Sequence, residues 1–482
     1  MVLNQRHRTA ISRTTISRPL RLALETELID DDSTVLDYGC GRGDDIRALQ
    51  ARGIACQGWD PVHRPEGTRQ ESDVVNLGYV VNVIENPDER SETLCEAWKL
   101  AQKVLLVSAR LSVEARGATH RIYNDGYLTQ RGTFQKFFTQ SELREWIDTT
   151  LGVSSVAAGP GIFFIFRDNA LRQTYAASRY RRSLAVPSQY QSDVLFERHQ
   201  DILTPLIHFV TFRGRLPDES ELQESALLRE VFGSIPRAFR VIRSATGKEQ
   251  WETIHEERSQ DLLIYLALER FKGRPRFSAL PHDLQRDVKS FFGTYRRACE
   301  IADELLFSVG NMETVKAACK EATCGKLTPE ALYVHTSALP NLPPVLRVYE
   351  GCARRYIGAV EGANVIKLNR RTPKISYLSY PDFERDPHPA LSESLVVQLQ
   401  TFDVRYFDYR DSDSPPILHR KEEFVSADHP LREKFARLTR QEERWGLFAH
   451  PLAIGTRNKW NQLLADKGVY LSGNRLTRRE KR

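Results

Sequence analysis

Length, composition and charge already limit what this chain can be. Its 482 residues are enough for roughly two or three domains with buried cores. The formal net charge of +6 permits a polyanionic partner without requiring one. The seven cysteines lack the spacing of a zinc site, so the sequence predicts no bound metal and favours a reduced, cytoplasmic compartment. No apolar stretch reaches the length of a transmembrane helix, which argues against a membrane protein.

A glycine-rich turn lies between a predicted strand and a predicted helix at Val35–Asp45. The apolar run before it ends in Asp37, and Gly39, Gly41 and Gly43 follow at alternate positions. Glycines let the backbone approach a ligand that a Cβ atom would exclude. Strand, glycine turn and helix together form the first unit of a doubly wound α/β nucleotide-binding domain.

The acids around this turn narrow the choice of ligand. A phosphate-binding loop would end in Gly-Lys-Ser/Thr, whereas this turn is followed by Asp44 and Asp45. Carboxylates at that place would repel a pyrophosphate and suit a ligand with cationic groups. The pattern Asp-x-Gly-x-Gly-x-Gly resembles motif I of class I S-adenosylmethionine (SAM) methyltransferases, whose cofactor carries a sulfonium and an ammonium group. The alternative is a structural turn in some other α/β protein.

The following segments alternate between strand and helix patterns. Ile54–Trp59 reads as a strand that ends at Asp60, where a carboxylate would accept hydrogen bonds from ribose hydroxyls. Further elements are predicted as strands over Val74–Leu77, Val104–Val107 and Gly161–Phe166, and as helices that begin after Asn86 and Thr139. This order predicts a Rossmann-like class I methyltransferase domain over residues 1–170.

The interval between Asp60 and Asp73 is too short for the usual pair of elements. Its twelve residues include Pro61, Pro65 and Gly67, and they cannot hold both a helix and an edge strand. The sheet is therefore expected to have a shortened edge, which leaves the usual adenine-contacting position without a clear counterpart. Asp73 could bind the cofactor there, or it could be a solvated residue at the start of a strand.

Candidate acceptor-binding residues follow the third strand and lie in a later loop. The stretch 76–84 contains Tyr79 and Asn82 but lacks the Asn/Asp-Pro-Pro-aromatic motif of DNA amino methyltransferases. In the loop 123–138, aromatic residues alternate with Gln135 and Lys136, and such a loop could stack on a base and hold a phosphate. The same aromatic residues could equally pack the loop onto the sheet. These four side chains are the acceptor-side candidates, and no catalytic base is identified.

The rest of the chain has a different pattern. Residues 171–190 are predicted to be a linker, residues 191–335 a helical region and residues 336–482 a small α+β region. The strongest helical pattern is a single apolar stripe over Asp283–Phe307. Arginines are concentrated before the glycine turn, where they could contact a nucleic acid or another substrate, or simply belong to a solvated terminus.

Motifs along nearly the whole chain resemble one bacterial family. They include RTAISRTTISRPL, VLDYGCGRGDD, GTFQKFFTQSEL, GKLTPEALYVH, SYLSYPDFERDPHPAL and LTRQEERWGL, in that order. They are similar to the DNA phosphorothioation-associated methyltransferases. This resemblance implies a place beside systems that replace a nonbridging phosphate oxygen of DNA by sulfur, in defence against foreign DNA. It implies DNA and other proteins of such a system as partners, and it assigns SAM roles to Asp37, Gly39, Gly41, Gly43 and Asp60 only.

The sequence thus predicts a SAM-dependent methyltransferase that acts on DNA or another nucleic acid. Two alternatives stay open at this point. One is a SAM- or DNA-binding accessory protein without methyl transfer, which the missing proline motif and the lack of an assured base support. The other is a methyltransferase of small molecules. The sequence indicates neither the acceptor atom nor the oligomeric state.

Overall fold

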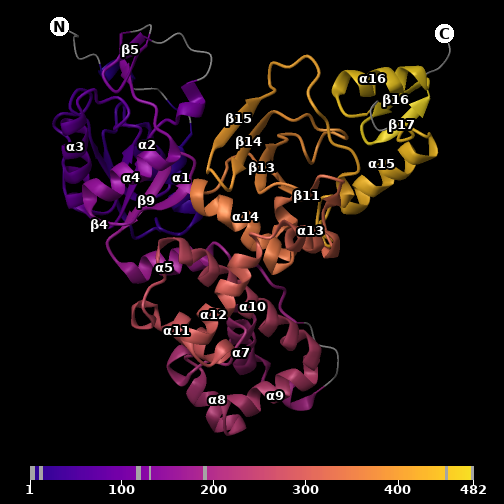
Figure 1. The fold of residues 1–482 in the computed structure, drawn as a ribbon. Helices are drawn as coiled ribbons and strands as arrows, with labels where there is room; N and C mark the ends of the chain where they lie inside the picture. Colours follow the sequence, from indigo (N-terminus) through magenta and orange to yellow (C-terminus); the bar gives the residue numbers. More distant parts are fainter. Residues whose placement is uncertain are drawn as a thin grey trace. The chain divides into compact units, whose positions relative to one another are not determined.

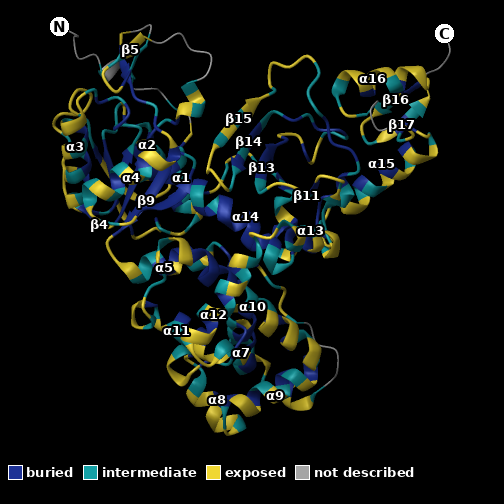
Figure 2. Ribbon diagram, in the orientation of Figure 1, coloured by how far each residue is buried: buried dark blue, intermediate teal, exposed yellow. Residues whose placement is uncertain are grey.

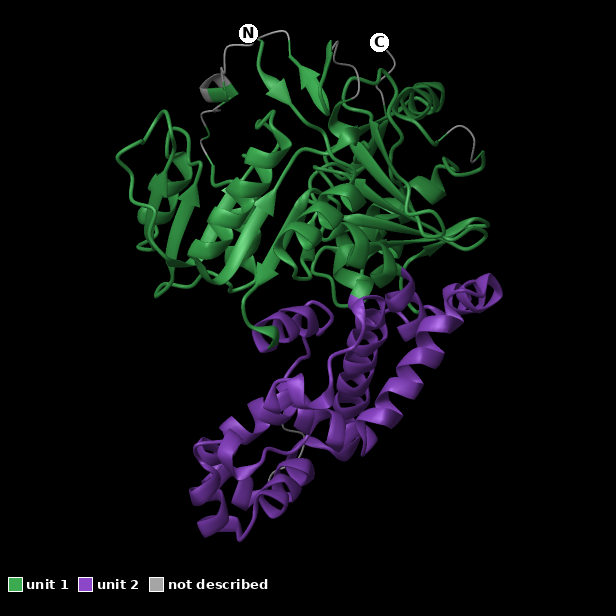
Figure 3. Cartoon of the chain, turned by 60° about the vertical axis from the view of Figure 1, so that its left-hand side comes forward, with its two compact units in different colours: residues 1–169, 323–339, 350–482 green, residues 170–322, 340–349 purple. Residues whose placement is uncertain are grey.

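The computed structural model describes residues 6–9, 13, 15–115, 121–129, 132–187, 193–450 and 454–478. The chain divides into two compact units, which Figure 3 distinguishes by colour. Unit 1 comprises residues 1–169, 323–339 and 350–482, and unit 2 comprises residues 170–322 and 340–349. None of the helices in the described ranges combines the length and the apolar character needed to cross a bilayer.

The N-terminal part of unit 1 is built on a six-stranded sheet (Figure 1). Its strands are β1 (Thr34–Tyr38), β2 (Ala55–Trp59), β3 (Ser72–Gly78), β4 (Ala101–Ser108), β8 (Val156–Gly159) and β9 (Ile162–Phe166). They lie in the order β2-β1-β3-β4-β9-β8. The first four are parallel, while β9 runs antiparallel to both β4 and β8. Parallel strands covered on both faces are apolar along their length, and the central strands are accordingly buried (Figure 2). The predicted Rossmann-like α/β fold is confirmed.

Helices flank this sheet, namely α1 (Arg18–Glu25), α2 (Asp44–Gln50), α3 (Pro87–Leu100) and α4 (Gln140–Leu151). Two of them, α3 and α4, begin with side-chain caps. Helix α3 begins where the Asn86 side chain accepts a hydrogen bond from the backbone of Asp88, and α4 begins with a reciprocal capping box between Thr139 and Glu142. Leu94 of α3 and Leu143 of α4 are fully buried in one core with the strands. The helix starts predicted from the sequence are therefore confirmed.

The sheet ends at β2, as the short interval after Asp60 predicts. Residues 61–71 form turns and coil, with one isolated bridge between Asp60 and Arg64 and no further strand. The proline-containing segment folds back on itself here, because the Arg64 amide donates to the carbonyl of Asp60 at 3.1 Å. The predicted shortened edge is thus present.

The C-terminal part of unit 1 is an antiparallel α+β region. Its six strands are consecutive neighbours: β10 (Lys326–Leu327), β11 (Ala331–His335), β12 (Val365–Asn369), β13 (Lys374–Ser379), β14 (Glu393–Gln398) and β15 (Val404–Asp408). Helices α15 (Arg432–Arg444) and α16 (Arg457–Asp466) and the hairpin of β16 (Val469–Ser472) and β17 (Arg475–Arg478) follow this sheet. Helix α14 (Pro344–Ile357) begins in unit 2, and its residues from Glu350 belong to unit 1. A small three-stranded sheet precedes α4: β5 (Arg121–Tyr123), β6 (Gly126–Leu128) and β7 (Phe134–Gln135).

The structure places two domain boundaries differently from the sequence prediction. The predicted linker 171–190 contains most of helix α5 (Asn169–Ser178), so the chain stays regular there. The predicted helical region 191–335 includes β10 and β11, yet β11 pairs with β12 in the C-terminal sheet. The strand partner of β11 lies about thirty residues further along the chain, which local pattern cannot reveal.

Unit 2 is helical. Beside α5 it contains α6 (Val194–Arg198), α7 (Gln200–Arg213), α8 (Ser225–Phe232), α9 (Ile235–Thr246), α10 (Lys248–Glu269), α11 (His282–Phe292), α12 (Tyr295–Ser308) and α13 (Met312–Glu321). The single stripe predicted over Asp283–Phe307 is wrong, because the chain breaks into α11 and α12. Gly293 ends α11 with φ of 72°, and Thr294 caps α12 by accepting from the Arg297 amide.

Candidate functional site

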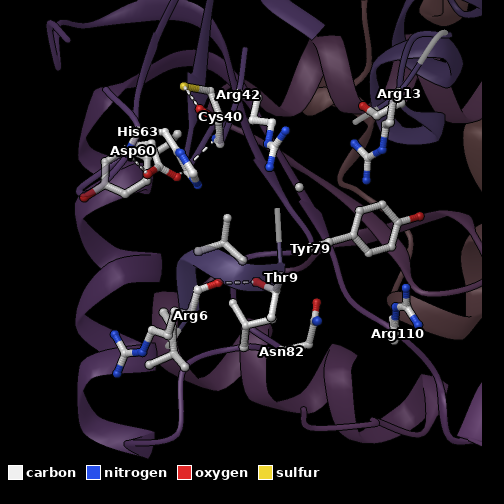
Figure 4. Close-up of a pocket in the computed structure, with 18 of the residues that line it drawn as sticks. Arg6, Thr9, Arg13, Cys40, Arg42, Asp60, His63, Tyr79, Asn82 and Arg110 are labelled. Carbon is white, nitrogen blue, oxygen red and sulfur yellow. Dashed lines mark hydrogen bonds between the residues drawn. The ribbon is translucent and has the colours of Figure 1, made fainter. Parts of the chain in front are cut away.

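A cavity of about 990 Å³ opens at the carboxyl ends of the parallel strands. Its walls come from the segments that follow β1, β2 and β3, namely 38–42, 59–63 and 78–84. Arg110 after β4 and residues of the N-terminal segment also line it (Figure 4). Further lining residues are Glu89, Thr93, Glu114, Gln135 and Glu361. Open α/β sheets bind their ligands outside the carboxyl ends of the strands, so this cavity lies where the fold predicts a nucleotide site.

The glycine turn requires glycine at its first and last positions. Gly39 has φ of +84°, and a Cβ atom there would collide with a methyl group of Val80. Gly43 has φ of +73°, and a Cβ atom would lie 2.7 Å from the guanidinium of Arg64. Gly41 lines the cavity with φ of 51°. Left-handed conformations are strained for other residues, so side chains at these positions would distort the turn.

Asp60 joins the glycine turn to the turn after β2. Its Oδ2 accepts a hydrogen bond from the Gly41 amide at 3.1 Å, and its Oδ1 accepts from the amides of Val62 and His63 at 2.9 and 2.8 Å. A carboxylate accepts about four hydrogen bonds, so acceptor capacity remains for a ligand hydroxyl. Asp60 lines the cavity (Figure 4), and ribose binding by this residue stays a prediction.

Asp37 lies behind the cavity wall and does not line it. The side chain is buried and accepts a hydrogen bond from the Asn76 side-chain amide at 2.8 Å. Burial, reinforced by the nearby Asp45 carboxylate, raises the pKa of Asp37 to about 7. The structure therefore gives Asp37 a supporting position between β1 and β3, and direct contact with a ligand does not follow from it.

Asp44 and Asp45 also face away from the ligand, contrary to the expectation from the sequence. Asp44 accepts a hydrogen bond from the Arg13 amide at 2.7 Å. Asp45 accepts from the Ser17 amide at 2.7 Å and lies 3.5 Å from the Arg13 guanidinium. These two carboxylates lie in the first turn of α2, where negative charge interacts favourably with the helix dipole. They also hold the N-terminal segment against this turn. That segment, through Arg13 and Ser17, is thereby part of the cavity wall.

Asp73 lies at the amino end of β3, and the cavity lies at the carboxyl end. Its carboxylate accepts from the amide and hydroxyl of Thr34 at 3.0 and 2.9 Å and pairs with Lys103 at 3.0 Å. It is absent from the cavity lining. The structure therefore does not bring Asp73 to the cofactor site, and its contacts fasten β3 to β1 and β4.

Tyr79 and Asn82, both predicted on the acceptor side, line the cavity just beyond β3. Tyr79 has φ of 59°, and its amide donates to the Ser108 carbonyl at 2.9 Å. A tyrosine in the left-handed region is strained, and such strain is concentrated at functional sites. Asn82 is only 2% exposed, and among the described residues its Oδ1 has no hydrogen-bond partner. A buried amide oxygen without a donor is costly unless a ligand supplies one.

Of the other two acceptor candidates, Gln135 and Lys136, the first lines the cavity and the second does not. Gln135 lines the cavity, and its side-chain amide donates to the Asn82 carbonyl at 3.3 Å. Lys136 does not line the cavity, because its ammonium group pairs with Asp125 at 3.1 Å and Glu142 at 2.8 Å. Its backbone amide donates to the Asn82 carbonyl at 2.7 Å. Lys136 thus holds the loop in place, and the predicted phosphate contact is not supported by its position.

Arginines dominate the polar lining of the cavity. The six are Arg6, Arg13, Arg18, Arg21, Arg42 and Arg110. The first four belong to the N-terminal cluster for which substrate contact was one of two interpretations. Arg42 and Arg110 were missed, and each carries a usable signal because it follows the carboxyl end of a core strand. Within the described ranges no group of three or more His, Cys, Asp or Glu side chains is arranged to hold a metal ion.

The comparison with protein families decides the class of this site. A family model described as a methyltransferase domain matches residues 5–150. The N-terminal domain is a methyltransferase domain. Its cofactor is SAM, and the glycine turn from Gly39 to Arg42 lines the cavity. The match ends within α4, before strands β8 and β9. It says nothing of unit 2 or the C-terminal region.

Solved structures match about a third of this chain at low identity. The 1,6-didemethyltoxoflavin-N1-methyltransferase of Burkholderia thailandensis is 16% identical over 34% of this chain and 78% of that chain, with a TM-score of 0.24. The CcbJ methyltransferase of Streptomyces caelestis is 13% identical over 33% and 93%, also at 0.24. The magnesium protoporphyrin IX methyltransferase of Synechocystis PCC 6803 is 12% identical over 34% and 93%, at 0.22. Scores this low support no inference about function. No curated protein matches the chain.

Proposed function

We propose that the protein is a SAM-dependent methyltransferase that acts on DNA or another nucleic acid within a DNA phosphorothioation system. The observation that carries the acceptor side is the buried Oδ1 of Asn82, which lines the cavity without a hydrogen-bond donor from the described residues. This oxygen lies beyond the end of β3, while the glycine turn that suits the cofactor lies beyond the end of the neighbouring β1. Cofactor and acceptor positions therefore adjoin in one cavity.

The chemistry of Asn82 indicates the kind of group that is methylated. SAM supplies an electrophilic methyl group, and the acceptor must present a lone pair in line with it. An amide oxygen accepts a hydrogen bond from an N–H or O–H group and would orient that group toward the methyl donor. Tyr79 adds an aromatic side chain beside the same position, on which a base could stack. An exocyclic amino group of a nucleobase has both a nitrogen that can accept the methyl group and an N–H that can donate to the Asn82 oxygen.

Two further observations support a nucleic acid. The cavity lining contains Arg42 and Arg110 after the ends of core strands, and arginine is the residue best suited to phosphate recognition. The sequence motifs quoted above resemble phosphorothioation-associated methyltransferases along nearly the full length of the chain. That resemblance supports the choice of DNA and of a phosphorothioation system.

Transfer of a labelled methyl group tests the proposal. The full chain is incubated with methyl-labelled SAM and, separately, with phosphorothioated DNA, the same DNA without sulfur, and tRNA. We expect label on DNA. Label on none of the three, together with calorimetric binding of S-adenosylhomocysteine (SAH), would favour an accessory protein or a small-molecule methyltransferase. Absence of SAH binding would overturn the use of the cavity as a cofactor site.

A further inference from the structure

Three of the six arginines in the cavity are already neutralised by carboxylates of the same chain. Arg6 is bound to Glu85 and Glu89. Arg18 and Arg21 both pair with Glu361, and Arg18 also donates to the carbonyl of Ala359 at 2.9 Å. These arginines stabilise the cavity wall, and they have little capacity left for a ligand.

Arg110 differs from these residues. Its side chain is partly exposed and lines the cavity, and among the described residues it has no ion-pair partner. Arg13 is intermediate, because its guanidinium lies 3.5 Å from Asp45, whose other oxygen accepts from the Ser17 amide. An arginine left without a carboxylate in a cavity retains its hydrogen-bond donors for an anionic ligand.

Arg13 and Arg110 lie on opposite sides of Tyr79 (Figure 4). The Arg13 guanidinium lies 5.5 Å from the centre of the Tyr79 ring. The Tyr79 hydroxyl has no hydrogen-bond partner within the described ranges, and its burial raises the pKa of the phenol, so it remains a donor at neutral pH. Glu114, which also interacts with Tyr79, accepts from the Leu111 amide at 2.8 Å and lies near Arg18. Three donor groups thus surround one part of the cavity.

The strand order separates Arg110 from the glycine turn. The glycine turn follows β1, whereas Arg110 follows β4, and β3 lies between the two strands. Arg42 lies within the glycine turn itself and is the arginine nearer in sequence to the cofactor-binding backbone. The carboxylate of SAM is therefore expected on the Arg42 side, and the donors around Tyr79 are left for the acceptor.

We propose that Arg110, Arg13 and the Tyr79 hydroxyl form a subsite for a phosphate group of the methyl acceptor. Phosphate oxygens of a diester only accept hydrogen bonds. The two guanidinium groups only donate them, and the Tyr79 hydroxyl has one O–H to donate at neutral pH. The neighbouring Asn82 oxygen requires a donor, so the cavity selects a molecule that carries a phosphate and an N–H or O–H group. A nucleotide unit of a nucleic acid meets both requirements. This inference rests on the proposed function and names the part of the substrate that the protein holds.

Binding of a short single-stranded oligodeoxynucleotide to the full chain saturated with SAH tests this subsite. We expect Arg110→Gln to weaken oligonucleotide binding about tenfold or more, as loss of one charge-assisted hydrogen bond implies, and to leave SAH affinity within about threefold. Inorganic phosphate should compete with the oligonucleotide in the wild type, whereas acetate at the same ionic strength should not. Arg52→Gln is the matched control, because Arg52 is exposed and does not line the cavity; it should change neither affinity.

The contrary results are distinct. Loss of SAH affinity in Arg110→Gln with unchanged oligonucleotide binding would assign Arg110 to the cofactor and overturn the subsite. Competition by acetate and not by phosphate would also overturn it. If Arg110→Gln does not fold, Tyr79→Phe removes only the hydroxyl, and unchanged oligonucleotide binding there would contradict the proposal. Failure of methyl transfer with intact, Arg110-dependent oligonucleotide binding would refute the proposed function alone.

Discussion

The buried carboxyl of Asp37 makes the stability of the methyltransferase domain depend on pH. Its pKa is raised from 3.8 to about 7, first by burial and then by the Asp45 carboxylate. Asn76 donates to one oxygen of Asp37, and the Asn76 Oδ1 has no partner among the described residues. A protonated Asp37 carries the kind of donor that this oxygen lacks, so the folded state favours the neutral acid. Asp37→Asn imitates that neutral form at every pH.

The size and sign of the effect follow from the two pKa values. Because the folded pKa of Asp37 is raised, its stability contribution is present below pH 3.8 and is lost as the pH rises to about 7. A shift of one unit corresponds to about 1.4 kcal/mol. The wild type should therefore lose about 2.5 kcal/mol relative to Asp37→Asn between about pH 5 and about pH 8. The contributions of other titrating groups to the unfolding free energy are the same in the wild type and in Asp37→Asn, unless those groups contact Asp37 directly, so they cancel in the difference.

Urea unfolding at both pH values, followed by tryptophan fluorescence, measures this difference. We expect Asp37→Asn to gain stability over the wild type as the pH rises, by about 2.5 kcal/mol across the interval. SAH must be absent, since a bound cation near Asp37 would lower its pKa. A difference in unfolding free energy that is equal at the two pH values would refute the raised pKa. A variant that loses stability relative to the wild type on raising the pH would refute the sign.

Three further substitutions test the placement of the cofactor. Gly39→Ala should weaken SAH binding about tenfold or more, because its Cβ would collide with Val80 in a backbone conformation that alanine disfavours; calorimetry showing wild-type affinity would contradict this account of the turn. Asp60→Ala removes the acceptor of three backbone amides and should weaken SAH binding about 10- to 100-fold. Asp73→Asn should leave SAH affinity within about twofold while lowering the unfolding free energy by about 1 kcal/mol, because Asp73 pairs with Thr34 and Lys103 and does not line the cavity; a large loss of SAH binding would return Asp73 to the cofactor site.

Local sequence was sufficient for the elements that local chemistry determines. The prolines and the glycine between Asp60 and Asp73 exclude a helix and a strand whatever the tertiary context, and the sheet does end at β2. Capping residues mark the starts of α3 and α4 for the same reason. Tyr79 and Asn82 could be selected because they directly follow a core strand, and the ends of such strands meet at the ligand site.

The errors concern side-chain partners that the sequence does not identify. Asp44 and Asp45 look available for a cationic ligand until the amides of Arg13 and Ser17, about thirty positions earlier, occupy them. Lys136 looks like a phosphate ligand until Asp125 and Glu142 bind it. A carboxylate or an ammonium group in a sequence has no marked partner, since ion pairs are set by the tertiary fold.

The break in the predicted helix over Asp283–Phe307 has another cause. The apolar positions before and after Gly293 continue with helical spacing, so the stripe shows no interruption. Leu284 and Val288 of α11 and Ala298 and Ala302 of α12 are all buried in the helical unit. In the sequence, a glycine followed by a threonine is a signal for the end of one helix and the start of the next. At Gly293 and Thr294 this signal is more informative than the helical spacing of the apolar residues.

The most direct test of the central claim is single-turnover methyl transfer by Asn82→Ala. The claim is that the buried Oδ1 of Asn82 positions the methyl acceptor beside SAM. We expect Asn82→Ala to reduce transfer of label from SAM to DNA about 10- to 100-fold, as loss of one buried hydrogen bond to the substrate implies, with SAH affinity within about threefold of wild type. Wild-type transfer rates in Asn82→Ala, or an equal loss of SAH binding and transfer, would contradict the account.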